Sequence, residues 1–102
     1  MPSIVKGVLE EELDRSLSLQ KKYEQKLADY PKGYLLERKI KGKLYYYLSY
    51  REGEKICQKY LGNLPEKEVN NLQKQMEDKK NLKKQLAEVK ANIKYLKRLL
   101  KQ

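Results

Sequence analysis

The first third of the chain spaces its apolar and bulky side chains with the period of a helix. Between Gly7 and Tyr30 there is no proline, and these positions alternate by four and three residues. Such spacing places one stripe of side chains on one helix face. Pro31 and Gly33 then end the pattern, because neither residue continues a helix well. The sequence predicts a helix over residues 7–30, whose stripe consists of Leu9, Leu13, Ser16, Gln20, Tyr23, Leu27 and Tyr30.

The middle of the chain changes to a period of two, which is the period of a β-strand. Two pairs, Lys41-Gly42 and Glu52-Gly53, divide this stretch into three runs that are rich in tyrosine. A residue pair ending in glycine between two alternating runs is a hairpin signal. We therefore predict a three-stranded antiparallel β-meander over residues 34–61, with strands Tyr34–Ile40, Lys43–Arg51 and Glu54–Leu61.

The last third of the chain again has a helical period and contains neither proline nor glycine after Pro65. Proline suits the first turn of a helix, where its missing N–H costs nothing. Apolar residues then recur by four and three, as in the seam of a coiled coil. The sequence predicts a long C-terminal coiled-coil helix over residues 65–101, with a seam formed by Leu72, Leu82, Leu86, Val89, Ile93, Leu96 and Leu100.

This seam needs a partner, because a monomer rarely leaves an apolar stripe of that length exposed. Either the first helix covers it in an intramolecular antiparallel pair, or a second copy covers it in a homodimer. The expected class is α+β: an N-terminal helix, a three-stranded antiparallel β-meander and a long C-terminal coiled-coil helix. At 102 residues the chain is expected to form a single domain, residues 1–102.

The charge of the chain is strongly positive and unevenly placed. The formal net charge is +10. Residues 1–30 carry five basic and six acidic side chains, residues 31–64 carry eight and three, and residues 65–102 carry eleven and five. A cationic surface attracts polyanions and releases their counterions, so nucleic acid is the predicted partner. The simpler interpretation is that the lysines only keep the protein in solution.

Composition argues against several other classes of function. The chain has no histidine and one cysteine, Cys57, so it lacks the usual general base and the usual metal-ligand spacings. It has no glycine-rich phosphate loop. We therefore predict no catalytic residue, no metal and no cofactor, and expect that the protein is not an enzyme. No stretch approaches the roughly 18 apolar residues that would cross a bilayer, so we expect a cytoplasmic protein without a membrane partner.

The predicted register assigns the side chains of the sheet to two faces. With two-residue turns, Ile40 faces Lys43 and Arg51 faces Glu54. The aliphatic face, with Leu35, Leu48, Cys57 and Leu61, is then the expected core side. The alternative, in which the tyrosines pack under a helix instead, stays open. The candidate nucleic-acid-binding residues of the outer face are Arg38, Lys43, Tyr45, Tyr47, Arg51, Gln58 and Tyr60.

The long helix adds a second set of candidates. Its C-terminal half is basic, and most of its charges lie off the seam, so it can bind a phosphate backbone or an acidic groove of another protein. The residues concerned are Lys83, Lys84, Lys90, Lys94, Lys97 and Arg98.

The sheet region also resembles a known module. Its features are Pro31-Lys32-Gly33-Tyr34, Ile40-Lys41-Gly42-Lys43 with Tyr45-Tyr46-Tyr47, Tyr50-Arg51-Glu52-Gly53-Glu54-Lys55 and Tyr60-Leu61-Gly62. This pattern is similar to one in small uncharacterised bacterial and phage proteins, and to the three-stranded region that precedes the catalytic part of some transposases and tyrosine recombinases. The resemblance covers residues 31–64 and implies DNA binding through Arg38, Lys43, Tyr45, Tyr47 and Arg51. Only a helix follows here, so it does not imply recombinase or transposase chemistry.

Two hypotheses follow. The first is a non-catalytic nucleic-acid-binding accessory protein of a mobile element or phage, with DNA favoured over RNA. The second is a protein-interaction module, such as a phage-encoded inhibitor or antitoxin-like protein, that grips an acidic partner protein through its coiled coil. Salt dependence separates them, because phosphate contacts weaken steeply as salt rises.

Overall fold

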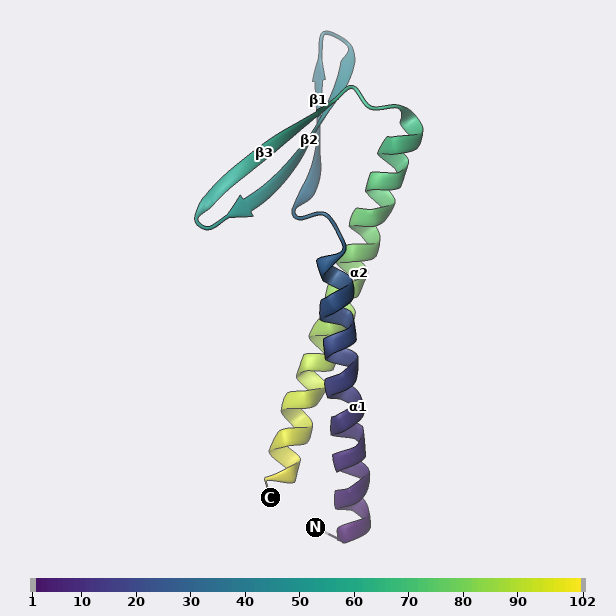
Figure 1. Ribbon diagram of the computed structural model, residues 1–102, viewed down its shortest axis with the longest axis vertical. Coiled ribbons are helices and arrows are strands. Elements are labelled where there is room, and N and C mark those ends of the chain that lie inside the picture. Colours follow the sequence, from purple (N-terminus) through teal and green to yellow (C-terminus); the bar gives the residue numbers. More distant parts are fainter. Residues whose placement is uncertain (1, 102) are drawn as a thin grey trace. The chain divides into compact units, whose positions relative to one another are not determined.

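The computed structural model describes residues 2–101, so only the outermost residue at each end of the expected domain lies outside it. Two helices flank three consecutive strands (Figure 1). The α+β class and the order of elements are confirmed. The elements are α1 (Ser3–Ala28), β1 (Tyr34–Ile40), β2 (Lys43–Glu52), β3 (Lys55–Gly62) and α2 (Glu66–Leu100).

Helix α1 begins four residues before the predicted start at Gly7. Pro2 is its N-cap residue, with an extended backbone of φ −59° and ψ 142°. The backbone N–H of Lys6 donates to the Pro2 carbonyl at 3.0 Å, which closes the first turn. Proline is well suited to a helix start, and the glycine at position 7 is tolerated inside the helix. The helix ends at Ala28, where Asp29 caps it, two residues before the predicted end.

The chain forms two compact units. The sheet unit comprises residues 30–79, which are the three strands and the first part of α2. The helix-pair unit comprises α1 and the part of α2 from Lys80 onwards. One helix thus supplies side chains to both units, and each unit has buried residues of its own.

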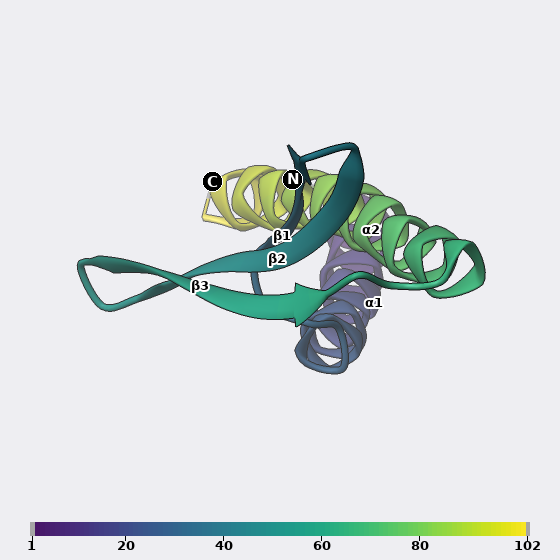
Figure 2. The same ribbon diagram turned by 90° about the horizontal axis from the view of Figure 1, so that it is seen from above.

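In the helix-pair unit the two helices run antiparallel, side by side (Figures 1 and 2). Their contact buries most of the predicted seam. The buried seam residues are Leu82, Leu86, Val89, Ile93 and Leu96, each 6–9% exposed. On α1 the predicted stripe is also the covered one, with Ser16 at 7% exposure as its most buried member. The seam is therefore closed within one chain, and these residues need no second copy to cover them.

The sheet has the order β1-β2-β3 with antiparallel pairing, as a meander requires. In the first hairpin Ile40 pairs with Lys43, which confirms the predicted register. Lys41 and Gly42 form the turn, with φ values of 51° and 80°. Two successive positive φ angles are typical of a type I′ turn, which matches the twist of the flanking strands.

In the second hairpin the predicted register is wrong by one residue on each strand. Glu52 pairs with Lys55, so Arg51 faces Ile56 and not Glu54. The turn is Gly53-Glu54, and Gly53 takes a φ of 63° at its first position. Glycine is favoured there because a side chain would strain that conformation. Both strands shift together, so each residue keeps its predicted face.

The aliphatic face of the sheet is the covered one. Tyr46 on β2 and Val69 on α2 are each 6% exposed, and both line a hollow together with Leu44 and Leu64. A second hollow lies among Leu48, Leu61, Leu64 and Leu72. Leu72 therefore belongs to the sheet unit, where α2 packs on the strands, and not to the buried seam of the helix pair.

Candidate nucleic-acid interface

Three tyrosine rings gather on the outer face of the sheet, the face that does not carry Tyr46. Tyr47 and Tyr60 are direct partners across β2 and β3, and their ring centroids lie 5.2 Å apart at 51°. The rings of Tyr45 and Tyr60 lie 6.4 Å apart at 32°. These separations fall in the range in which tilted aromatic rings attract each other. The strands thus hold three rings as one group.

The turn of the second hairpin brings Tyr60 opposite Tyr47. Because Glu52 pairs with Lys55, the same register pairs Tyr47 with Tyr60. A β-bulge follows this pair, since the register shifts between Tyr46 and Tyr47 and Tyr46 pairs with Gly62. A bulge adds a residue to one strand and increases the local twist. In the predicted register Tyr60 would oppose Tyr45. In the structure it opposes Tyr47 and also contacts Tyr45 from the side.

Two polar side chains complete this group. The guanidinium carbon of Arg38 lies 5.0 Å from the centroid of the Tyr47 ring, a cation–π contact. Nη2 of Arg38 also donates to Oε1 of Gln58 at 3.4 Å. Arginine and glutamine are the side chains that most often read base edges. We call this set the tyrosine cluster: Arg38, Tyr45, Tyr47, Gln58 and Tyr60.

The tyrosine cluster is accessible to a ligand. Tyr60 is 57% exposed, and Arg38 and Gln58 are exposed. Tyr45 and Tyr47 are half-buried, and the ring of each lies beside that of Tyr60. Fixed rings with open faces lose little conformational entropy when a flat group stacks on them. The arrangement therefore suits a planar partner, such as a nucleic-acid base.

Two predicted residues lie outside the tyrosine cluster. Lys43 is exposed at the first residue of β2, two residues before Tyr45. Arg51 lies near the other end of β2, where it lines a separate hollow with Lys32 and Lys79. At about 3.3 Å per residue, Lys43 and Arg51 are separated by roughly 26 Å. The sequence analysis grouped them because they share a face, and missed Lys32 and Lys79, which have no common period with the strands.

The six predicted basic residues in the C-terminal half of α2 lie on one side of that helix. With about 100° between successive residues, their directions fall within about 140°, and the seam is centred about 120° away. Lys90 also forms an exposed ion pair with Glu24 at 3.9 Å, and such pairs contribute little to stability. All six of these residues are exposed, and we call them the basic stripe: Lys83, Lys84, Lys90, Lys94, Lys97 and Arg98.

Three further observations concern the described part of the chain. Residues 2–101 contain no group of three or more histidine, cysteine or carboxylate side chains placed to hold a metal ion. Over the same residues, no helix is both long and apolar enough to pass through a bilayer. Cys57 is half-buried, and its Sγ lies 3.9 Å from a carboxylate oxygen of Glu52.

Comparison with known proteins places the chain in a family. Residues 6–71 match the family described as Domain of unknown function (DUF6788). The match contains nearly all of α1, the whole sheet and the start of α2. The tyrosine cluster therefore lies inside it, and the basic stripe lies beyond its end. No curated protein and no solved structure matches the chain.

Proposed function

We propose that this chain, which belongs to the DUF6788 family through residues 6–71, is a non-catalytic nucleic-acid-binding accessory protein. Its ligand contacts the tyrosine cluster, and the basic stripe adds phosphate contacts. The observation that carries the proposal is an exposed group of three tyrosine rings with Arg38 stacked on Tyr47, in a protein of net charge +10.

The tyrosine cluster combines two kinds of contact. Unpaired bases stack on aromatic rings with a gain of about 1–3 kcal/mol each, whatever their sequence. In an intact duplex the base faces are covered by their neighbours, and there the tyrosine hydroxyls can contact phosphates instead. Arg38 and Gln58 add hydrogen-bonding groups that suit base edges, and a long hydrogen bond of 3.4 Å places the two side chains next to each other. Stacking thus provides affinity, and the polar pair provides a preference among bases.

The proposed ligand is DNA rather than RNA. A twisted antiparallel ribbon fits the major groove of B-form DNA, as other sheet readers do. The major groove of an A-form RNA helix is too deep and narrow for side chains to read. The resemblance of residues 31–64 to the DNA-binding region of some transposases and tyrosine recombinases supports the same choice. A mobile element or phage is the proposed context, and the cytoplasm is the proposed compartment, where Cys57 stays reduced.

The first experiment is an electrophoretic shift panel of duplex DNA, single-stranded DNA and duplex RNA at two salt concentrations. We expect duplex DNA to bind at low salt and to weaken steeply as salt rises, because each neutralised phosphate adds about 0.9 to the logarithmic salt slope. Replacing Lys90 and Lys94 with glutamine should lower that slope by up to about two. If no oligonucleotide binds even in dilute buffer, the proposal is wrong.

A matched pair of variants tests the tyrosine cluster itself. Arg38 and Lys39 are neighbours on β1, both exposed and on opposite faces of the sheet. Arg38→Ala should weaken DNA binding more than Lys39→Ala, although both remove one positive charge. Tyr60→Ala should weaken the binding of single-stranded DNA by about 5- to 150-fold, which corresponds to the loss of one stacked base. Equal effects of the Arg38 and Lys39 variants would show that only net charge matters.

The second candidate function is a grip on an acidic partner protein. The seam of the coiled coil is buried within the chain, so this function would rest on the outward-facing basic stripe alone. A homodimer likewise stays a prediction that would need a surface other than the seam. Poly-glutamate binding to the basic stripe, without any oligonucleotide binding, would favour this second candidate.

A further inference from the structure

A second cationic site lies in the sheet unit, away from the tyrosine cluster. It is an open hollow of about 490 Å³ at the end of the sheet where β1 begins. Binding sites for small molecules commonly have volumes of about 300–1,000 Å³. Three of the lining residues are basic and none is acidic. The full lining is Lys32, Gly33, Tyr34, Ser49, Tyr50, Arg51, Ile56 and Lys79.

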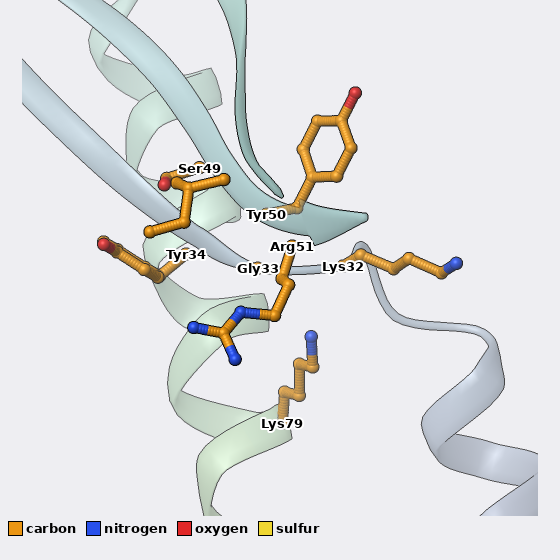
Figure 3. A pocket seen from close by; sticks show the side chains of 8 residues that line it. Lys32, Gly33, Tyr34, Ser49, Tyr50, Arg51 and Lys79 are labelled. Carbon is orange, nitrogen blue, oxygen red and sulfur yellow. The ribbon is translucent and has the colours of Figure 1, made fainter. Parts of the chain in front are cut away.

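The positive charges of this hollow come from distant parts of the sequence. Arg51 projects from β2 and Lys79 from α2, and both line the hollow; in Figure 3 the Lys79 ammonium points up toward the Arg51 side chain, the guanidinium of Arg51 turns to the left, and Lys32 extends to the right. Neither of the two ion pairs found among residues 2–101 involves Arg51 or Lys32. Bringing like charges together costs free energy unless an anion offsets it.

The side of the hollow that carries Lys79 is held in position by contacts within the protein. Nζ of Lys79 donates to the Pro31 carbonyl at 2.7 Å, and the bond is partly buried. Gly33, two residues after Pro31 in the same loop, has a φ of 83° and lies directly against the backbone of Ser49. Ser49 itself is 1% exposed. The ammonium of Lys79 is thus fixed at the edge of the hollow before any ligand arrives, which lowers the entropy cost of binding.

We propose that this hollow binds a phosphate monoester, with Arg51 and Lys79 holding the phosphate. A monoester carries about −1.5 to −2 charges near pH 7 and offers three acceptor oxygens. Two cations match this charge better than they match the single negative charge of a backbone diester. The planar guanidinium of Arg51 can donate to two oxygens at once, whereas the Lys79 ammonium acts as a point charge.

The lining also indicates what the phosphate is attached to. The volume exceeds that of a phosphate alone, and Tyr34, Tyr50 and Ile56 supply apolar and aromatic surface beside the cations. Tyrosine rings contact the sugar or the base of a nucleotide well. The ligand is therefore a nucleoside monophosphate unit, either free in solution or at the 5′ end of a nucleic-acid strand. The proposal for the tyrosine cluster does not depend on this site.

The decisive experiment compares oligonucleotides of one sequence with a 5′-phosphate or a 5′-hydroxyl, by fluorescence anisotropy, with adenosine 5′-monophosphate and adenosine as competitors. We expect the strand with a 5′-phosphate to bind about tenfold more tightly than the strand with a 5′-hydroxyl. Charge-assisted hydrogen bonds to a phosphate contribute enough free energy for a preference of that size. Arg51→Gln and Lys79→Gln should abolish the preference, and their effect on the affinity for the 5′-hydroxyl strand should be no larger than the effect of losing one positive charge elsewhere on the sheet unit. Lys79→Arg, which keeps the charge, should retain it.

Lys74→Gln is the matched control, because Lys74 is exposed on the same helix and does not line the hollow. It should keep the tenfold preference. Urea unfolding of every variant separates a lost site from a lost fold. Competition by the monophosphate but not by adenosine, sensitive to Arg51→Gln, would identify the free nucleotide as a ligand.

The possible results separate the two proposals. Equal binding of phosphorylated and hydroxyl strands, with no competition by the monophosphate, overturns the phosphate site and leaves the tyrosine cluster standing. Direct binding of adenosine 5′-monophosphate in calorimetry, lost in Arg51→Gln, with no oligonucleotide binding at all, supports the phosphate site and overturns the proposed nucleic-acid interface. No binding of any phosphate-bearing probe overturns both.

Discussion

Three consecutive tyrosines on β2 show how differently one residue type is used on the two faces of the sheet. Tyr46 is 6% exposed and belongs to the core beneath α2. Tyr45 and Tyr47, its immediate neighbours, are half-buried and contact Tyr60 on the outer face. Side chains alternate along a strand, so neighbours in the sequence never share a face.

The comparison teaches that position in the pleat, and not residue type, separates a structural tyrosine from a candidate binding tyrosine. The middle ring stabilises the sheet unit by leaving water, whereas the flanking rings keep faces open to a ligand. Substitutions on the covered face should therefore reduce stability strongly, and those on the outer face should reduce binding with little loss of stability.

The largest expected effect is that of Tyr46→Ala. Removing a buried aromatic side chain costs about 3–5 kcal/mol, so this variant should lower the free energy of unfolding by that amount. Tyr47→Ala should cost only about 0.5–1.5 kcal/mol, the contribution of its ring contacts, while it lowers DNA affinity. Urea denaturation measures the first quantity and anisotropy the second. Similar losses of stability in both variants would mean that the two faces are not distinct.

The helix-pair unit provides the next comparison, between two residues of α2. Ile93 is 6% exposed and Tyr95 is 54% exposed. Ile93→Ala should lower the free energy of unfolding by about 2–5 kcal/mol, and Tyr95→Ala should change it by less than about 0.5 kcal/mol. The measurement is again urea denaturation, at two protein concentrations. A concentration-dependent midpoint would point to a second copy on the helix pair, because oligomers gain stability by mass action.

Two glycines with nearly equal backbone angles differ in whether a side chain at that position would collide with the protein. Gly33 and Gly42 have φ values of 83° and 80°. A Cβ at Gly33 would collide with the backbone of Ser49, whereas one at Gly42 meets nothing within 4 Å. Gly42→Ala should cost about 1–2 kcal/mol from the left-handed backbone alone. Gly33→Ala should cost about 1–3 kcal/mol more, because the strand must move. Equal melting temperatures of the Gly33→Ala and Gly42→Ala variants would contradict this predicted difference in stability.

A small effect on stability is expected for Arg38→Ala. An exposed cation–π contact contributes about 0.5–1 kcal/mol, and the Arg38 guanidinium lies over the Tyr47 ring. A double-mutant cycle with Tyr47→Ala isolates this contribution, since the two residues touch. A coupling free energy near zero would mean that Arg38 is not held over the ring, and that the tyrosine cluster does not preorganise its charge.

The sequence analysis predicted the elements well where a single period dominates. Strand β1 and the first hairpin have the predicted bounds and register, because alternation and the Lys41-Gly42 pair indicate the same turn. The prediction was less successful in the second hairpin, where two residue pairs could form the turn. Glu52-Gly53 and Gly53-Glu54 both satisfy the pattern, and the conformational freedom of Gly53 selects the second.

The candidate site was predicted in part. Arg38, Tyr45, Tyr47, Gln58 and Tyr60 come together as expected from their shared face, but Tyr60 lies opposite Tyr47 and not Tyr45, because the second turn is Gly53-Glu54. Arg51 shares that face too, yet it lines the phosphate hollow with Lys79, which is 28 positions later in the sequence. A period identifies which side of an element a residue occupies, and not which other element lies there.

By itself, the sequence determined what depends on neighbours along the chain: two helices around a three-stranded meander, a basic surface, and two dissimilar faces on the sheet. The tertiary structure alone decided which face α2 covers, that the seam of α2 closes against α1, and that Arg51 meets Lys79. The preference of a segment for helix or strand depends on a few neighbouring residues and can be predicted from the spacing of its side chains. Contacts between distant segments depend on the balance of burial over the whole fold, which no single stretch of sequence contains.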